Sequence, residues 1–160
     1  MKMLVALLWS GCLAACSDLG IDVGSLADLE RAEARWDRVR PESYSFAVER
    51  ICYCPVEGIG PVRILVEGDS VLTRTYVDSG EGVPASIARF FPPVDSLFGI
   101  LRSAYVQGAH DVRVTYHPVH GFPAEFYIDY DRMTADEELG MRITEQPVSA
   151  RLELSATSAH

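Results

Sequence analysis

The sequence predicts an α+β domain in which two helices cover one face of an antiparallel sheet of about six strands. The prediction depends on two amphipathic helical segments, each followed by three strand-like segments. The resulting order is α-β-β-β, a loop, and α-β-β-β again. Two helices are enough for one face only, so the other face of the sheet is expected to be open.

The first helix is expected to begin after Ser25, which can act as its N-cap, with Asp28 three residues later. The apolar stripe that follows at helical spacing consists of Leu29, Ala32, Trp36 and Val39. Pro41 stops the helix, because proline lacks the N–H that would continue the hydrogen-bond ladder.

Three strands are predicted next. Residues 44–55 read YSFAVERICYCP, and residues 61–78 hold two further strands on either side of Gly68 and Asp69, which is a hairpin signal. Residues 79–93 are expected to form a loop with a short turn at 86–90.

The second half repeats this pattern. Asp95 is expected to cap a helix that Gly108 ends. The residues of this helix that should face the core are Leu97, Phe98, Leu101, Ala104 and Tyr105. Residues 111–118, 124–131 and 140–148 are predicted strands, and residues 149–160 form a tail that either extends the last strand or frays.

The two halves, residues 25–78 and 93–148, resemble each other at a constant shift that sets Cys54 opposite His117, with one gap at Gly60. The residues Arg50, Ile51, Tyr53, Pro55, Val56, Gly58, Pro61 and Asp69 then align with Arg113, Val114, Tyr116, Pro118, Val119, Gly121, Pro123 and Asp131. Each half alone would have a small core. We therefore interpret residues 25–148 as one domain built from a tandem α-β-β-β repeat.

Residues 1–15 have the pattern of a secretory signal, with Lys2 before a short apolar run that is below the roughly 20 residues needed to span a bilayer. The segment from Leu13 to Cys16 resembles a bacterial lipobox, whose cysteine is lipidated and becomes the mature N-terminus. Cys12 fits this pattern less well, and an ordinary cleaved signal is the alternative. Lipidation at Cys16 would anchor the chain through acyl groups, with residues 16–24 as a tether.

The residue after Cys16 indicates the membrane to which the chain is anchored, and the net charge limits the kinds of partner. Ser17 after Cys16 favours the outer membrane, so we expect the chain on its periplasmic face. The formal net charge of −9 makes nucleic acid an unsuitable partner. Lys2 is the only lysine, which excludes Schiff-base chemistry in the mature chain. No G-x-S-x-G motif or glycine-rich phosphate loop is present, so we expect neither catalysis nor a cofactor.

Cys52 and Cys54 are the two cysteines left once Cys12 is removed with the signal and Cys16 carries lipid. Residues i and i+2 on a strand lie about 6.6 Å apart, near the upper limit for the Cα atoms of a disulfide. A bridge therefore requires the strand to pucker. We interpret the pair as a local disulfide, with a redox-active or metal-binding thiol pair and inert free thiols as alternatives.

The apolar pattern changes phase close to this pair. Residues 44–48 alternate with one parity, whereas the repeat aligns Ile51 and Tyr53 with apolar positions of the second half. We therefore predict a β-bulge near Arg50 that turns Ile51 and Tyr53 inward and leaves the cysteines at outward, polar positions.

His117 and His120 take the places of Cys54 and Glu57 in the repeat. If the two turns lay at one end of the sheet, Cys52, Cys54, His117 and His120 could form a zinc- or copper-like set. This spacing is unusual for a metal site, and we interpret the histidines as exposed turn residues, with no metal. The acid-rich segment 129–138 lacks the EF-hand spacing and is interpreted as a solvated hairpin loop.

Several short motifs together resemble the DUF6174 family, a bacterial family of unknown function found mostly in predicted lipoproteins. The residues that carry the resemblance are Trp36, Tyr44, Phe46, the Cys52-x-Cys54-Pro55 motif, Gly68, Gly121-Phe122-Pro123, Ile128-Asp129 and Asp136-Glu137-Glu138. The similarity covers roughly residues 28–148, and the histidines are not part of it. It implies the fold, the lipid anchor and the importance of these positions, but no reaction. The architecture also resembles proteinaceous β-lactamase inhibitors and small envelope-assembly lipoproteins.

Tyrosines occur on both faces of the predicted strands, so some of them should line the open face of the sheet. The binding-face candidates are Tyr76, Tyr127 and Tyr130. We therefore expect a lipid-anchored envelope protein that binds a protein partner without catalysis, as an assembly or inhibitor-like module. The alternative is a thiol-redox or metal-handling protein that uses Cys52 and Cys54.

Overall fold

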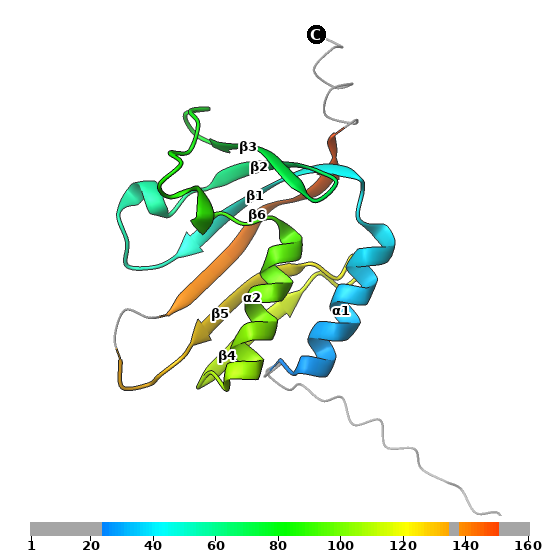
Figure 1. Cartoon of the computed structure of the whole chain (residues 1–160), viewed down its shortest axis with the longest axis vertical. Coiled ribbons are helices and arrows are strands. Elements are labelled where there is room, and N and C mark those ends of the chain that lie inside the picture. Colours follow the sequence, from blue (N-terminus) through cyan, green and yellow to red (C-terminus); the bar gives the residue numbers. More distant parts are fainter. Residues whose placement is uncertain (1–23, 135–137, 151–160) are drawn as a thin grey trace, which may run out of the picture.

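The structure is a computed structural model that describes residues 24–134 and 138–150. Its elements, in chain order, are α1 (Leu26–Val39), β1 (Ser43–Ile51), a 3-10 turn (Val56–Gly58), β2 (Val62–Glu67), β3 (Ser70–Tyr76), a 3-10 turn (Ala88–Phe90), α2 (Val94–Gln107), β4 (Asp111–Tyr116), β5 (Pro123–Asp129) and β6 (Leu139–Ser149). The predicted order of helices and strands is confirmed (Figure 1). The signal, most of the tether and residues 151–160 of the tail lie outside the described residues.

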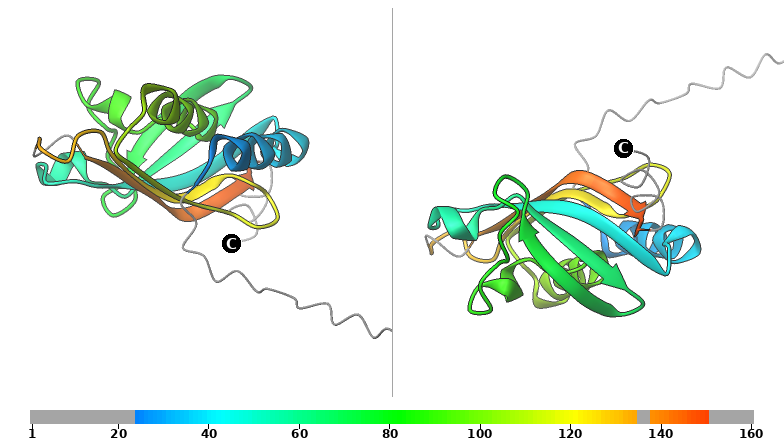
Figure 2. Two further views of the ribbon diagram at one scale, coloured as in Figure 1. Left: turned by 90° about the horizontal axis from the view of Figure 1, so that it is seen from below. Right: turned by 90° about the horizontal axis from the view of Figure 1, so that it is seen from above.

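The strands form one six-stranded antiparallel sheet in the order β3-β2-β1-β6-β5-β4. Both helices lie on the same face of this sheet (Figure 2), which confirms the predicted α+β class. β1 and β6 pair in the middle and join the two halves, while β3 and β4 are the edge strands. Within the described part of the chain, neither helix has the length and apolar content to cross a membrane.

The core lies between the helices and the sheet. α1 begins with the predicted capping box between Ser25 and Asp28, and it buries Leu29, Ala32 and Trp36. α2 buries Leu97, Phe98, Leu101 and Ala104 as predicted, together with Val94, and it ends at Gly108 in the left-handed conformation. Val39 was predicted to be buried and is 48% exposed. It is the last residue of α1, where the chain turns back towards β1.

Asp95 does not cap α2, contrary to the prediction. The N-cap is Pro93, so Asp95 is the second helical residue and its carboxylate is free to reach α1. One oxygen accepts a hydrogen bond of 2.9 Å from Nε1 of Trp36, and the other accepts one of 2.8 Å from Arg40. Asp95 therefore connects the two helices.

The β4–β5 turn packs directly on α1. Gly121 has a φ of +86°, and a Cβ at this position would collide with the carbonyl oxygen of Ala32 and lie 2.8 Å from Cβ of Arg35. The next residue, Phe122, is buried edge-on against Trp36 with 6.0 Å between ring centroids. A side chain at Gly121 would therefore push the turn off the helix.

The two halves share an order of elements, but their aligned residues occupy different environments. Val114 is buried, whereas its counterpart Ile51 is 40% exposed. Tyr116 stacks on Phe98 in α2, whereas its counterpart Tyr53 is fully exposed. The halves follow one another in the same lateral order across the sheet, yet β1 and β4 run in opposite directions. A rotation that reverses the strand direction and keeps this lateral order also turns the sheet over. No rotation can therefore superpose the two halves while both helices stay on one face.

The predicted bulge near Arg50 is also wrong. The irregularities in the β1–β6 pairing lie between Ser45 and Val48, and the extra residues belong to β6. The inward parity of residues 44–48 therefore continues along β1, and Ile51 points away from the core. Simple alternation along β1 gives this phase, and the wrong expectation came from the alignment of Ile51 with Val114 of the second half.

We predict that Gly121→Ala lowers the free energy of unfolding by about 3 kcal/mol or more, because left-handed strain and overpacking against a helix backbone combine. The matched control is Gly68→Ala, since Gly68 also has a positive φ but nothing lies within 4 Å of an added Cβ. It should cost only about 1 kcal/mol. Urea unfolding of both variants measures the difference, and equal losses would contradict the packing of the turn on α1.

Candidate functional site

The cystine turn, defined as residues 51–55, lies where β1 ends. Cys52 and Cys54 form a disulfide with 1.99 Å between the sulfurs and 5.4 Å between the Cα atoms, which is an ordinary Cα separation. β1 ends at Ile51, so both cysteines lie outside the sheet ladder and not within the predicted longer strand. Tyr53, between them, is fully exposed to solvent.

The loop that follows the disulfide is fixed to the sheet by several contacts. The backbone N–H of Arg50 donates to the carbonyl of Ile59 at 2.7 Å, and the guanidinium of Arg50 lies over the ring of Phe90 at 4.5 Å. Burial lowers the pKa of Arg50. The Tyr76 hydroxyl donates to the carbonyl of Glu57 at 2.8 Å. The cystine turn is therefore presented on a supported loop.

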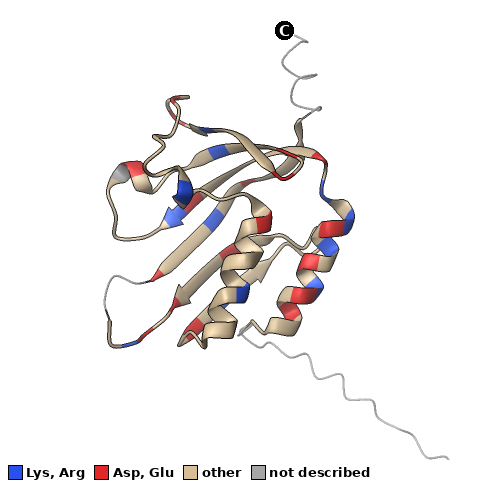
Figure 3. Cartoon of the chain, in the orientation of Figure 1, with Lys and Arg blue, Asp and Glu red and all other residues tan. Residues whose placement is uncertain are grey.

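A hollow of about 400 Å³ lies beside the cystine turn. Its lining residues are Arg50, Ile51, Cys52, Tyr53, Cys54, Tyr127 and Glu138. Partial burial and the carboxylates of Glu138 and Asp129 raise the pKa of Tyr127, which also holds Arg113 over its ring at 5.0 Å. Acidic residues occur where β4 begins, β5 ends and β6 begins (Figure 3). The hollow therefore combines exposed apolar side chains with an acidic border.

Only one of the three binding-face tyrosines lies on the open face of the sheet. Tyr127 alternates with the buried Phe126 and Ile128, and it points to the open side. Tyr76 pairs with the buried Val62 and packs on the core, so it lies on the helix-covered face. Tyr130 lies beyond the end of β5 and also packs on the core. The placement predicted for Tyr76 and Tyr130 is therefore wrong.

The open face carries ion pairs where aromatic side chains were expected. Arg142 donates to Glu49 at 2.9 Å and to Glu125 at 2.8 Å, which lowers the pKa of Glu125. Arg63 and Glu145 bridge at 2.7 Å across β1. In the described strands, Tyr127 is the only aromatic residue on this face. The expected aromatic surface is therefore replaced by charges that are satisfied within the sheet.

The weak metal alternative, Cys52 and Cys54 with His117 and His120, is not assembled. β1 and β4 run in opposite directions, so the turns that follow them lie at opposite ends of the sheet. The cysteines are also bonded to each other. Among the described residues, no group of three or more His, Cys, Asp or Glu side chains is placed to hold a metal ion.

His117 has a structural role in the β4–β5 turn. Its Nδ1 accepts hydrogen bonds from the backbone N–H groups of Val119 at 3.3 Å and His120 at 3.0 Å. Its ring packs against the rings of both His120 and Phe122, at 4.6 and 4.7 Å between centroids. Burial and the neighbouring His120 lower the pKa of His117, so the fold favours the neutral imidazole.

Sequence reasoning missed the exposure of Ile51 and Tyr53. A signal for it was present, because a disulfide between residues i and i+2 fits poorly on an extended strand and Pro55 cannot continue a ladder. Both features predict that β1 ends before Cys52. The contribution of Glu138 and Tyr127 to the hollow had no local signal, since β5 and β6 reach this place only through long-range pairing.

We predict that the stability of the protein falls as pH decreases below about 6.5, the unperturbed pKa of histidine. A lowered folded-state pKa means that the unfolded chain binds the proton more readily. The stabilisation by His117 is therefore complete above that pH and is lost on acidification, when Nδ1 becomes a donor.

Urea midpoints between pH 7.5 and 5 measure this effect. Replacement of His117 by Gln should flatten the decline relative to wild type. The control is His110→Gln, which removes an exposed histidine and should leave the slope unchanged. An identical slope in all three proteins would contradict the acceptor role of His117.

One comparison of the sequence with known protein families gives a match. The sequence model of a family of unknown function (DUF6174) matches residues 28–146. No curated protein and no solved structure matched the chain. The family match covers most of the chain and the whole sheet up to β6, and the resemblance seen in the sequence is thereby confirmed: the chain belongs to the DUF6174 family.

Proposed function

We propose that this chain is a lipid-anchored protein of the cell envelope that binds a protein partner through the cystine turn, without catalysis. The observation that carries the proposal is Tyr53, a fully exposed aromatic side chain on a disulfide-bonded turn. Ile51 adds an exposed apolar side chain next to it. Large aromatic residues of this kind dominate the energetics of protein interfaces.

The support under the turn favours binding over a merely solvated loop. The disulfide and the contacts of Arg50 and Tyr76 hold the backbone, so docking of Tyr53 would order few additional groups. A preorganised turn loses less conformational entropy on association. The centre of the open face is a poorer candidate, because its arginines and glutamates are already paired with each other.

The chemistry of the partner follows from the border of the hollow. Glu138, Asp129 and Asp111 act on Tyr127, with Arg113 over its ring and Arg50 on the other side of the lining as the cations. The whole chain has a formal charge of −9. A complementary partner would present an apolar pocket for Tyr53, bordered by arginine or lysine.

The anchoring part of the proposal rests on the sequence. A lipidated Cys16 would tie the domain to the membrane through residues 16–24, which at about 3.5 Å per residue span at most about 30 Å. The partner is therefore expected at the same membrane surface, on the periplasmic face of the outer membrane. The acidic charge argues against nucleic acid as a partner.

We expect that a photo-crosslinking amino acid placed at Tyr53 forms one discrete adduct with a membrane-associated protein in the native host. Ile51→Asp should reduce this adduct about tenfold, because a buried carboxylate at the contact is strongly unfavourable. The matched control is the same crosslinker at Val106, which is 74% exposed on α2. Equal adduct patterns at both positions, or no adduct at Tyr53, would overturn the proposal.

The anchor is tested separately with Cys16→Ser. This variant should move from the membrane fraction to the soluble fraction and lose the crosslink at Tyr53. A variant that remains in the membrane would reject lipidation at Cys16.

A second candidate function is thiol–disulfide exchange, which the position of the two partly exposed cysteines in the lining of the hollow favours. A thiolate of a partner dithiol would attack one sulfur, break the S–S bond and release the other sulfur as a thiolate. The second thiol of the partner would then attack the mixed disulfide. The partner is thereby oxidised, and Cys52 and Cys54 are reduced.

Exchange is reversible, so in Cys52→Ala or Cys54→Ala the remaining thiolate should attack the disulfide of the oxidised partner and form a mixed disulfide in cells, visible on a non-reducing gel and absent after reduction. Alkylation in intact cells should also detect a reduced fraction of the wild-type pair. A pair that stays oxidised and variants that trap no protein would exclude exchange and leave the disulfide as a structural support for Tyr53.

A further inference from the structure

A second cavity, of about 240 Å³, lies between the start of α1 and the end of the edge strand β4. Its lining residues are Gly24, Asp28, Arg31, Arg35, Val114, Thr115 and Tyr116. The cavity is far larger than the roughly 30 Å³ that one water molecule occupies in the liquid. It is separate from the cystine turn, because β1 and β4 end at opposite ends of the sheet.

Three buried polar atoms, in residues that line or adjoin this cavity, have no hydrogen-bond partner. They are Nε of Arg35 and the hydroxyls of Tyr116 and Tyr105. Tyr105 lies next to the lining, since a Cβ on Gly24 would collide with its hydroxyl. Burial raises the pKa of both tyrosines, so both hydroxyls keep their protons and can donate. Buried polar groups are nearly always paired, so these three require an explanation.

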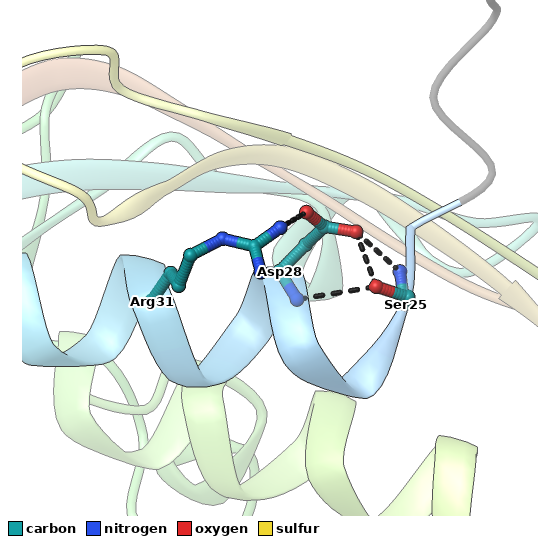
Figure 4. A network of polar contacts seen from close by, with 3 residues as sticks. All are labelled: Ser25, Asp28 and Arg31. Carbon is teal, nitrogen blue, oxygen red and sulfur yellow. Dashed lines mark hydrogen bonds and ion pairs between the residues drawn. The ribbon is translucent and has the colours of Figure 1, made fainter.

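Among the charged residues that line the cavity, Arg35 is the cation without a partner carboxylate. Asp28 accepts from the hydroxyl and the backbone N–H of Ser25 and pairs with Arg31 (Figure 4), and the bond from Ser25 is the main cause of its lowered pKa. The carboxylate of Asp28 is therefore already neutralised. Arg35 makes no hydrogen bond or ion pair with any other described residue. The residues at the cavity thus offer the unpaired guanidinium of Arg35 and two unpaired hydroxyl donors.

We propose that this cavity binds an oxyanion of the phosphate class, held by Arg35 and by the hydroxyls of Tyr116 and Tyr105. A guanidinium matches phosphate oxygens in geometry as well as charge, and hydrogen bonds to a charged group are stronger than those between neutral groups. Free phosphate and the phosphodiester of a lipid headgroup share this chemistry. The cavity begins at Gly24, the end of the tether, so the lipid source depends on the proposed anchor whereas the phosphate source does not.

The test is a titration of the purified full chain in a neutral detergent with inorganic phosphate, followed by calorimetry and by the Nε–H resonance of Arg35. We expect saturable binding that shifts this resonance. Arg35→Gln should weaken the affinity about tenfold, since a charge-assisted hydrogen bond is lost. The matched control, Arg38→Gln, makes the same change of charge in the exposed last turn of α1 and should alter the affinity less than about twofold.

Tyr116→Phe keeps the test independent of folding. Its hydroxyl has no partner, so its removal should leave the stability of the unliganded protein unchanged or higher, while it weakens phosphate binding by about the same factor as Arg35→Gln. Absence of saturable binding by the wild-type chain would overturn the proposal. So would a loss of affinity in Arg38→Gln as large as that in Arg35→Gln.

Two further titrations identify the source of the anion. Soluble dihexanoyl phosphatidylglycerol that binds more tightly than both inorganic phosphate and dihexanoyl phosphatidylcholine would support a headgroup site, and the reverse order would support free phosphate.

Discussion

The hydrogen bond from Trp36 to the Asp95 carboxylate is the contact on which the rest of the arrangement depends. It joins α1 to α2, and the same indole ring lies edge-on to Tyr44 of β1 and to Phe122 of the β4–β5 turn. A half-buried carboxylate requires a counter-charge, and Arg40 supplies it at 2.8 Å. One side chain therefore links both helices to one strand of the first half and one turn of the second, so the two halves fold around a common core.

The packing of this core also determines which side chains lie on the open face of the sheet. Alternation along the strands sends apolar residues inward and leaves charged residues outward, where they pair across strands. Ala47 shows how tight this layer is, because it is fully buried on the open face, with Arg63 and Glu145 as its cross-strand neighbours. A face closed in this way offers little to a partner. Ile51 and Tyr53 are instead exposed where β1 stops at the disulfide.

The sequence was sufficient for features that depend on neighbours along the chain. The capping box at Ser25, the buried stripe of α1 and the hairpin at Gly68 all follow from local spacing. Two errors concern contacts between distant segments: Asp95 accepts a hydrogen bond from Trp36, and Tyr76 follows the register of Val62. The third error, the phase at Ile51, came from the alignment of the two halves, since alternation along β1 continues without a break. The disulfide was local and predictable, whereas the hollow beside it requires the pairing of β5 with β6.

The direction of the strands separates the two proposed sites. If a twofold axis perpendicular to the sheet related the two halves, the strands of the second half would follow each other across the sheet in the opposite order to those of the first half. The observed order is β3-β2-β1 and then β6-β5-β4, so the order is the same in both halves. β4 therefore ends at the opposite end of the sheet from β1, so the cavity at Tyr116 and the turn at Tyr53 are far apart. The cavity adjoins Gly24, where the tether enters the domain. An anchor at Cys16 would hold this part close to the membrane and leave Tyr53 at the other end of the sheet, accessible to a partner.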